Sequence, residues 1–215
     1  MKTRQEIKGI ALTAFTDNYW IAVGVNFVIA LLIAVAASVT GGAAALVLTP
    51  SLVIGLNMFS LALYNGKQAT FDTAFNEGFD NFGHKLGGYL WMQLFIFLWS
   101  LLFVIPGVIK SYSYALTPYI LGDRKDVGAR DALKLSMRMM DGHKWELFVF
   151  QLSFLGWFLL SSLTGGILGV FYVNPYFSNA MAGYYAERKA AFAAETAAKD
   201  AFTPVTPAAE APTML

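Results

Sequence analysis

Three basic side chains recur at helical spacing in the segment 126–141 of this 215-residue chain. Arg130, Lys134 and Arg138 follow one another at intervals of four residues, which places them along one side of a helix. Such a row can bind an anionic lipid headgroup or a membrane partner, at roughly 1 kcal/mol per basic residue near a charged leaflet. Alternatively, these residues only set the orientation of the chain in a membrane. The sequence leaves both interpretations open.

One further basic residue, Lys110, falls inside an apolar stretch. A charge at the centre of a membrane helix costs roughly 2.5–3.5 kcal/mol on insertion scales. Lys110 lies three residues after Gly107, so its aliphatic stem can carry the ammonium group to the outer surface. If it points inward instead, it belongs to a candidate intramembrane polar site with four neighbours: Gln93, Tyr112, Tyr114 and Gln151.

Two histidines occupy matching positions, in Gly83-His84-Lys85 and in Gly142-His143-Lys144. No carboxylate stands at a metal-ligand spacing such as HExxH, so we expect interfacial or structural roles for both. The sequence has no P-loop, no GxSxG motif and no cysteine. We therefore expect no catalytic residue, no metal and no cofactor, and a protein that is not an enzyme.

The composition identifies the elements that must position these residues. The chain is 57% hydrophobic and only 13% charged, whereas about a quarter of the residues in a soluble domain are charged. Too few polar side chains remain to cover a globule in water. The net charge of +1 argues against a nucleic-acid partner. The composition predicts an integral membrane protein of the all-α class.

Six apolar stretches approach the roughly 20 residues that a membrane-spanning helix needs. The predicted spans are 19–39, 43–64, 86–105, 107–122, 145–163 and 166–186, of which the fourth is the shortest. Ala34-Val35-Ala36 resembles a signal-peptide cleavage site, but the first stretch is long for a signal peptide and Glu6 and Asp17 precede it. We expect an uncleaved first span.

The basic residues predict the orientation of these spans. Fourteen of the fifteen Lys and Arg residues lie outside the spans and on one side of the bilayer. The links 40–42, 106 and 164–165 carry no charge. By the positive-inside rule both termini are cytoplasmic in the cell membrane. Residues 1–186 then form one membrane domain, and 187–215 a cytoplasmic tail whose proline-containing last part is expected to be flexible.

The spans also show an internal repeat. The turn word Thr40-Gly41-Gly42 recurs as Thr164-Gly165-Gly166. A turn glycine after each odd span and a proline in the returning helix recur three times: Gly41, Gly107 and Gly165, then Pro50, Pro118 and Pro175. We predict three tandem units of the same orientation, each a surface helix followed by a transmembrane hairpin, unlike the inverted repeats of many transporters.

Each of the three prolines removes a backbone hydrogen bond and is expected to kink its helix. In a bilayer the freed carbonyl must find another donor on a neighbouring helix, a hydroxyl or a water molecule. Kinked returning helices can enclose a central cavity, or the kinks can serve only the packing of the helices. The sequence does not decide between these two roles.

Two segments predict amphipathic helices that lie at the membrane surface on the cytoplasmic side. The segment 68–82 places Phe71, Phe75, Phe79 and Phe82 at helical spacing. The segment 126–141 combines the basic row with an apolar face that includes Leu133 and Met137.

Several local words resemble a known family. They are Ala132-Leu133, Met139-Met140, Lys144-Trp145, Leu147-Phe148, Leu152-Ser153-Phe154-Leu155-Gly156-Trp157, Tyr112-Ser113-Tyr114 and Thr117-Pro118-Tyr119-Ile120-Leu121. Over roughly residues 1–185 the chain resembles the bacterial integral membrane proteins grouped as domain-of-unknown-function family 975. The resemblance implies a multispan membrane protein and carries over no catalytic residue.

The leading functional hypothesis is a non-enzymatic membrane protein, a scaffold or adaptor that contacts the lipid bilayer, its anionic headgroups or a membrane protein partner. One version is an envelope-stress or self-protection factor, which no residue singles out. The competing hypothesis is a small permease for a lipophilic or amphiphilic solute. A polar cavity near Pro50, Pro118 and Pro175 would favour the permease, and a packed interior would count against it.

Overall fold

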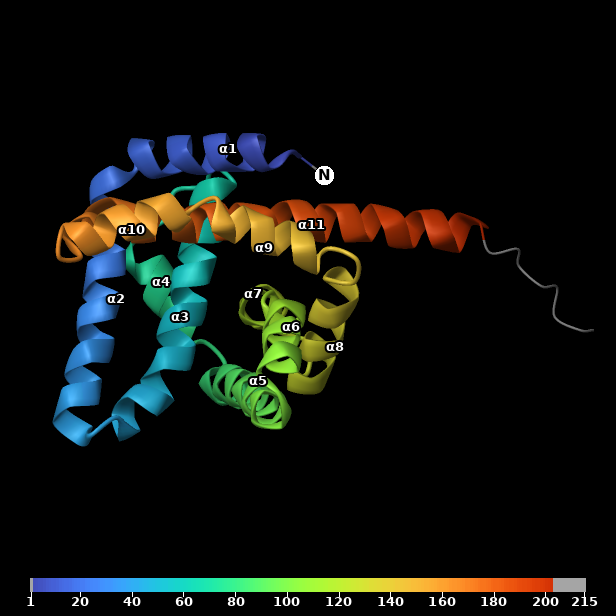
Figure 1. The fold of residues 1–215 in the computed structure, drawn as a ribbon, viewed down its shortest axis with the longest axis horizontal. Helices are drawn as coiled ribbons and strands as arrows, with labels where there is room; N and C mark the ends of the chain where they lie inside the picture. Colours follow the sequence, from blue (N-terminus) through green and yellow to red (C-terminus); the bar gives the residue numbers. More distant parts are fainter. Residues whose placement is uncertain (1, 203–215) are drawn as a thin grey trace, which may run out of the picture.

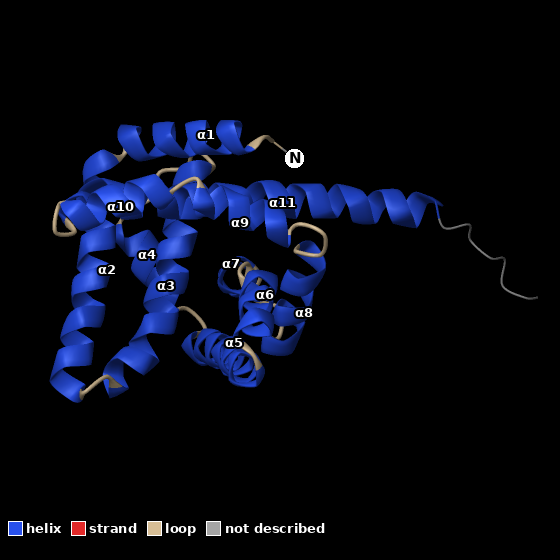
Figure 2. Ribbon diagram, in the orientation of Figure 1, coloured by secondary structure: helices blue, strands red, loops and turns tan. Residues whose placement is uncertain are grey.

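The computed structural model describes residues 2–202, and this part of the chain is helical with no strand (Figure 2). This confirms the all-α class that the composition predicts. The predicted flexible end of the tail, from residue 203 onward, lies outside the described residues.

The helices follow one another with short connections. In chain order they are α1 (Arg4–Asp17), α2 (Tyr19–Thr40), α3 (Ala43–Tyr64), α4 (Phe71–Phe79), α5 (Phe82–Leu102), α6 (Val104–Tyr114), α7 (Thr117–Asp123), α8 (Ala129–Met139), α9 (Lys144–Leu152), α10 (Leu155–Leu163), the π-helical turn η1 (Gly169–Val173) and α11 (Asn174–Phe202). Three helical segments of the described chain are long and apolar enough to cross a membrane: α2, α3 and the pair α9–α10. They are compatible with a membrane protein.

The first and last hairpin turns have the same geometry. Both glycines of each Thr-Gly-Gly word have positive φ, +60° and +97° in 40–42 and +64° and +87° in 164–166. The Thr40 hydroxyl accepts a hydrogen bond from the amide of Ala44 at 2.9 Å, and that of Thr164 from Leu168 at 3.3 Å. Only glycine adopts two successive left-handed conformations without strain, which explains why the word recurs.

The middle turn is built differently. The chain reverses at Phe103, which is extended, and Pro106 and Gly107 already lie in the first turn of α6. Gly107 is therefore not the turn residue that the repeat predicted. Its α-carbon faces Ser100 of α5 so closely that a Cβ would lie 2.3 Å from the Ser100 hydroxyl oxygen. Proline is tolerated at this position because the first turn of a helix needs no amide donor.

The prolines mark three different irregularities, although all three are buried. Pro50 lies within α3, which bends along its length in Figure 1. Pro118 lies in the first turn of α7, and Pro175 is the second residue of α11, which directly follows the π-helical turn η1. A fourth irregularity separates α9 from α10 at Ser153 and Phe154, inside the apolar stretch 145–163 and without a proline.

The short helices α1, α4 and α8 link the longer parts of the fold. α4 packs on α3 of the preceding hairpin, α8 packs against α5 and α7, and α1 packs along α11, the last helix of the chain (Figure 1). Each short helix thus contacts the hairpin before its own, and the first contacts the last. Contacts between distant parts of the sequence, such as α1 with α11, therefore add to the contacts between neighbouring helices.

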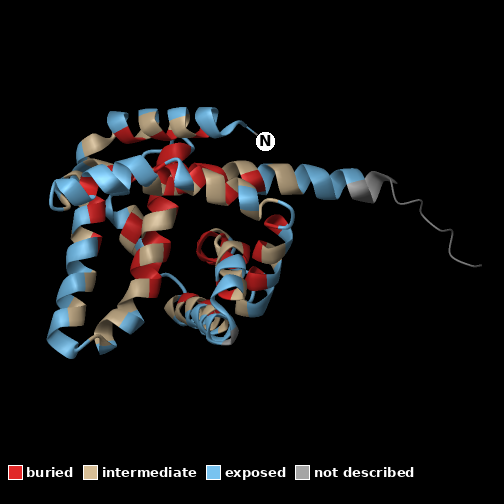
Figure 3. Ribbon diagram, viewed as in Figure 1, coloured by how far each residue is buried: buried red, intermediate tan, exposed pale blue. Residues whose placement is uncertain are grey.

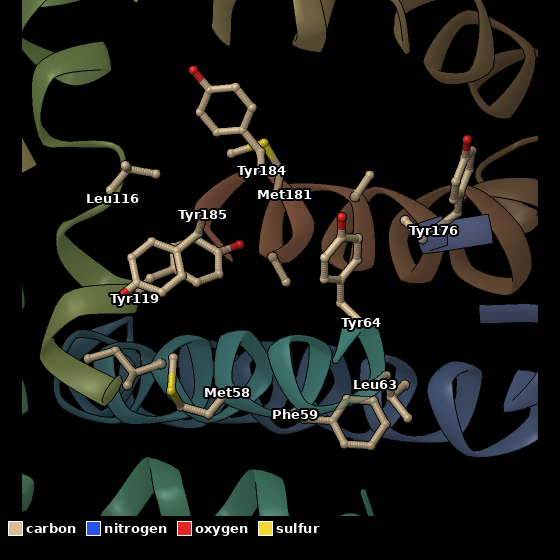
Figure 4. Packing of buried hydrophobic residues seen from close by; sticks show 14 of the residues in the cluster. Met58, Phe59, Leu63, Tyr64, Leu116, Tyr119, Tyr176, Met181, Tyr184 and Tyr185 are labelled. Carbon is tan, nitrogen blue, oxygen red and sulfur yellow. The ribbon is translucent and has the colours of Figure 1, made fainter. Parts of the chain in front are cut away.

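The core lies where the returning helices α3, α7 and α11 meet. Phe59 and Tyr64 from α3, Tyr119 from α7, and Tyr184 and Tyr185 from α11 are all buried there, and Tyr64 and Tyr119 point toward α11 (Figure 4). The rings of Tyr119 and Tyr185 stack with centroids 5.1 Å apart. We call this cluster, together with Met58, Leu63, Leu116, Tyr176 and Met181, the tyrosine hub.

The hairpin ends opposite the hub expose large apolar side chains (Figure 3). Leu101 is 74% exposed, Ile105 73% and Leu163 85%. Apolar surface on this scale is rare in a monomer surrounded by water and typical of contact with lipid or a partner.

Candidate anion-binding site

A cavity of about 350 Å³ lies between α6, α8 and the start of α9. Its wall contains four basic residues, Lys110, Lys134, Arg138 and Lys144, with one carboxylate, Asp141; Ser113 and Met137 complete it. We call this cavity the basic pocket. Four cations against one acid give it a net positive charge.

The amphipathic character of α8 positions two of these cations. Leu133 is buried in a small cluster with Met92 of α5 and Tyr114 of α6. The hydroxyl of Ser136 donates a hydrogen bond to the carbonyl of Ser113 at 2.8 Å, which joins α8 to α6. With the apolar face held in this way, Lys134 and Arg138 remain exposed beside the cavity.

Arg130 does not line the basic pocket, although it belongs to the same predicted row. Its guanidinium lies over the indole of Trp91, 5.5 Å from the ring centroid. Arginine stacks on aromatic faces because its delocalised charge is attracted to the π-electrons. The row Arg130, Lys134, Arg138 is therefore split between a ring contact and the pocket.

Lys110 contacts two aromatic rings and lines the basic pocket. Its ammonium lies over Trp99, 5.0 Å from the ring centroid, and over Tyr114 at 5.9 Å. It lines the same cavity as Lys134 and Lys144, which the sequence assigns to the cytoplasmic segments.

The other members of the predicted polar site do not come together at one place. The Tyr112 hydroxyl donates a hydrogen bond to Gln151 Oε1 at 3.1 Å, linking α6 to α9. Tyr114 contacts Lys110, whereas Gln93 is exposed on α5 and does not line the basic pocket. Lys144 was not among the predicted members of this site. Spacing along the chain could not show that it lines the same cavity as Lys110.

The charges of the pocket are poorly compensated by the protein itself. Lys134 approaches Asp131 at 3.9 Å with both side chains exposed, a geometry worth little in water. Lys110, Arg138 and Lys144 form no ion pair with the described residues. An added anion would supply the missing negative charge.

The histidines lie apart from this pocket's wall. His143 Nδ1 is 3.0 Å from Glu146 Oε2, and the His84 Nε2 atom is buried without a hydrogen-bond partner in the described part of the chain. Within residues 2–202 no group of three or more His, Cys, Asp or Glu side chains is arranged to hold a metal ion.

Two buried cations cap surface helices, a role that the sequence did not indicate. The ammonium of Lys85 donates to the carbonyl of Glu77 near the end of α4, and burial lowers the pKa of this lysine. The guanidinium of Arg188 donates from Nε to the carbonyl of Met139, the last residue of α8, at 2.6 Å. Cations are stabilising at helix C-termini because carbonyl groups there lack amide partners.

Comparison with known proteins agrees with the local words of the sequence. Residues 101–191, which include α6, α8, α9 and all four cations of the basic pocket, match the family described as a protein of unknown function, DUF975. No curated protein and no solved structure matches the chain significantly. The match at residues 101–191 supports the membership of this chain in the DUF975 family.

Proposed function

We propose that this protein is a non-enzymatic integral membrane protein that acts as an adaptor by binding the phosphate of anionic lipid headgroups in its basic pocket. The observation that carries the proposal is the convergence of Lys110, Lys134, Arg138 and Lys144 on one cavity with a single carboxylate. Phosphate is the common membrane anion that such a cluster would bind.

The surroundings of the basic pocket support a lipid as the source of the phosphate. Val108 and Ile109, next to Lys110, are 49% and 48% exposed. Trp145, next to Lys144, is 72% exposed. Exposed apolar and tryptophan side chains beside a cationic pocket suit the boundary between headgroups and acyl chains, where tryptophan is enriched.

We further propose six membrane passes in three tandem units, with both termini in the cytoplasm. The equal geometry of the first and last turns supports the repeat, as does the packing of α4 and α8 on the helices that precede them. The uncharged links and the fourteen cations outside the spans support the orientation.

The tyrosine hub bears on the permease hypothesis. The returning helices meet through stacked and buried rings, and Pro50, Pro118 and Pro175 are themselves buried. This arrangement favours a packing role for the prolines over a solute cavity between them. We therefore propose that the protein is an adaptor rather than a permease.

A binding measurement with matched variants tests the lipid proposal. Full-length protein in phosphatidylcholine nanodiscs is titrated with phosphatidylglycerol, and bound lipid is counted by native mass spectrometry. Lys134→Gln/Arg138→Gln should weaken binding about 30-fold, or about 2 kcal/mol for two basic residues. The control Lys67→Gln/Arg124→Gln removes two exposed cations outside the pocket. Equal binding by both variants would refute the proposal.

A further inference from the structure

A second cationic groove lies between α1 and α9, separate from the basic pocket. Two neighbouring cavities, about 690 Å³ and about 440 Å³, share Thr3, Arg4 and Val149 in their walls. The smaller one adds Lys8 and Ser153 to this wall. Arg4 and Lys8 are one helical turn apart in α1, so both reach the same side of the groove.

The ammonium of Lys8 has only part of its hydrogen-bonding capacity satisfied. It donates to the hydroxyl of Ser153 at 3.2 Å and lies 4.4 Å from the ring centroid of Phe154. An ammonium group has three donors. Lys8 is partly buried, and burial lowers its pKa, so an anion beside it would be stabilising.

The nearby carboxylates, including Glu146 in the wall of the larger cavity, each have another partner. Glu6 accepts hydrogen bonds from the Thr3 amide and hydroxyl, both at 2.7 Å. Glu146 pairs with His143 at 3.0 Å, and Lys2, the third cation of the groove, pairs with Glu187 at 2.6 Å. Arg4 and Lys8 form no ion pair with a carboxylate among the described residues.

The opposite wall of the groove presents apolar side chains beside Glu146 and Ser153. Trp145 is 72% exposed and lines the larger cavity with Val149. Two uncompensated cations facing an exposed indole match a molecule with an anionic head and an alkyl chain. The two cations alone would bind any anion, and the indole alone would contact any apolar group. Only an anionic amphiphile uses both features.

We infer that the groove between α1 and α9 binds an anionic amphiphile, with its phosphodiester or carboxylate head on Arg4 and Lys8 and its alkyl chain along Trp145 and Val149. The inference uses none of the four cations of the basic pocket and stands independently of the lipid site proposed there.

Quenching of Trp145 fluorescence tests this inference on the full-length chain in nanodiscs. Brominated phosphatidylglycerol and brominated stearate supply the two anionic heads, and brominated phosphatidylcholine supplies the zwitterionic reference. Trp145→Phe identifies the part of the signal that comes from Trp145. We expect at least one anionic probe to quench Trp145 about twice as strongly as the zwitterionic reference does, or more. The anionic probe that quenches more strongly identifies the headgroup that the groove prefers.

The variants decide between the two sites. Arg4→Gln/Lys8→Gln should abolish the excess quenching, and Arg4→Lys/Lys8→Arg, which keeps both charges, should retain it. Lys134→Gln/Arg138→Gln, in the basic pocket, should also retain it. The inference is overturned if no anionic probe exceeds the reference, if the excess survives Arg4→Gln/Lys8→Gln in folded protein, or if it is lost only with the basic-pocket variant.

Discussion

The phenol of Tyr185 donates a hydrogen bond to Asp123 Oδ2 at 2.7 Å, and the same oxygen accepts a hydrogen bond from Lys189 Nζ at 2.5 Å. Asp123 ends α7, and both donors belong to α11. The carboxylate of Asp123 therefore links α7 to α11 at the edge of the tyrosine hub.

Tyr185→Phe should lower the free energy of unfolding by about 1–2 kcal/mol, because a hydrogen bond to a charged group is lost while the stacked ring remains. Thermal unfolding in detergent, followed by far-UV circular dichroism, measures the change. Tyr89→Phe is the matched control, since the Tyr89 hydroxyl has no hydrogen-bond partner in the described part of the chain. Equal destabilisation by both changes would show that the bond to Asp123 contributes nothing.

Gly55→Ala should destabilise the contact between α3 and α4. A Cβ at Gly55 would lie 2.0 Å from the carbonyl oxygen of Ala74, a backbone atom that cannot rotate away. Overpacking of this kind costs about 1–3 kcal/mol. Gly87→Ala is the control, because a Cβ there meets nothing within 4 Å and alanine favours the helix. An unchanged melting temperature for Gly55→Ala would contradict the close approach.

The ion pair between Lys125 and Asp80 predicts a pH dependence of stability. Their nitrogen and oxygen atoms are 2.5 Å apart, and the hydrogen bond from Lys125 lowers the pKa of Asp80 below its ordinary value of 3.8. The pair therefore contributes fully above this value, and its contribution is lost as the pH falls through the lowered pKa.

Lys125→Gln should reduce thermal stability at pH 7 and have a smaller effect at pH 2.5. Unfolding curves of the two proteins at both pH values measure the difference. Arg124→Gln, the neighbouring cation without an ion pair to the described residues, should show no such convergence. A loss of stability that is equal at the two pH values would exclude Asp80 as the titrating partner.

Single cysteines test the proposed orientation, because the chain contains none. Cysteine at Val39, Phe103 or Leu163, all exposed near hairpin ends, should react with a membrane-impermeant maleimide added to intact cells. Cysteine at Lys67 or Arg124 should react only after the membrane is opened. Labelling of Lys67→Cys in intact cells would reverse the proposed topology.

Local sequence rules predicted those features that depend on residues close together in the chain. Two glycines after a threonine can form only a few tight turns, so the words at 40–42 and 164–166 correctly indicated the ends of two hairpins. The apolar blocks similarly predicted α2 and α3.

Features that depend on contacts between residues far apart in the sequence could not be predicted from these local rules. Gly107 looked like a turn residue, but the neighbouring helix requires its small size at Ser100. Lys110 and Lys144 line one cavity only because α6, α8 and α9 pack together. Spacing along the chain does not predict this packing. Arg188 reaches the end of α8 across 49 residues.

The closure of α1 against α11 has a consequence for biosynthesis. Ile7, Ala11 and Phe15 are fully buried in the finished protein, and α1 packs chiefly on α11, which is synthesised after all the other described helices. Throughout translation the nascent amino-terminal helix lacks its final contact. Until α11 is synthesised, the membrane surface or a chaperone must shield those three side chains.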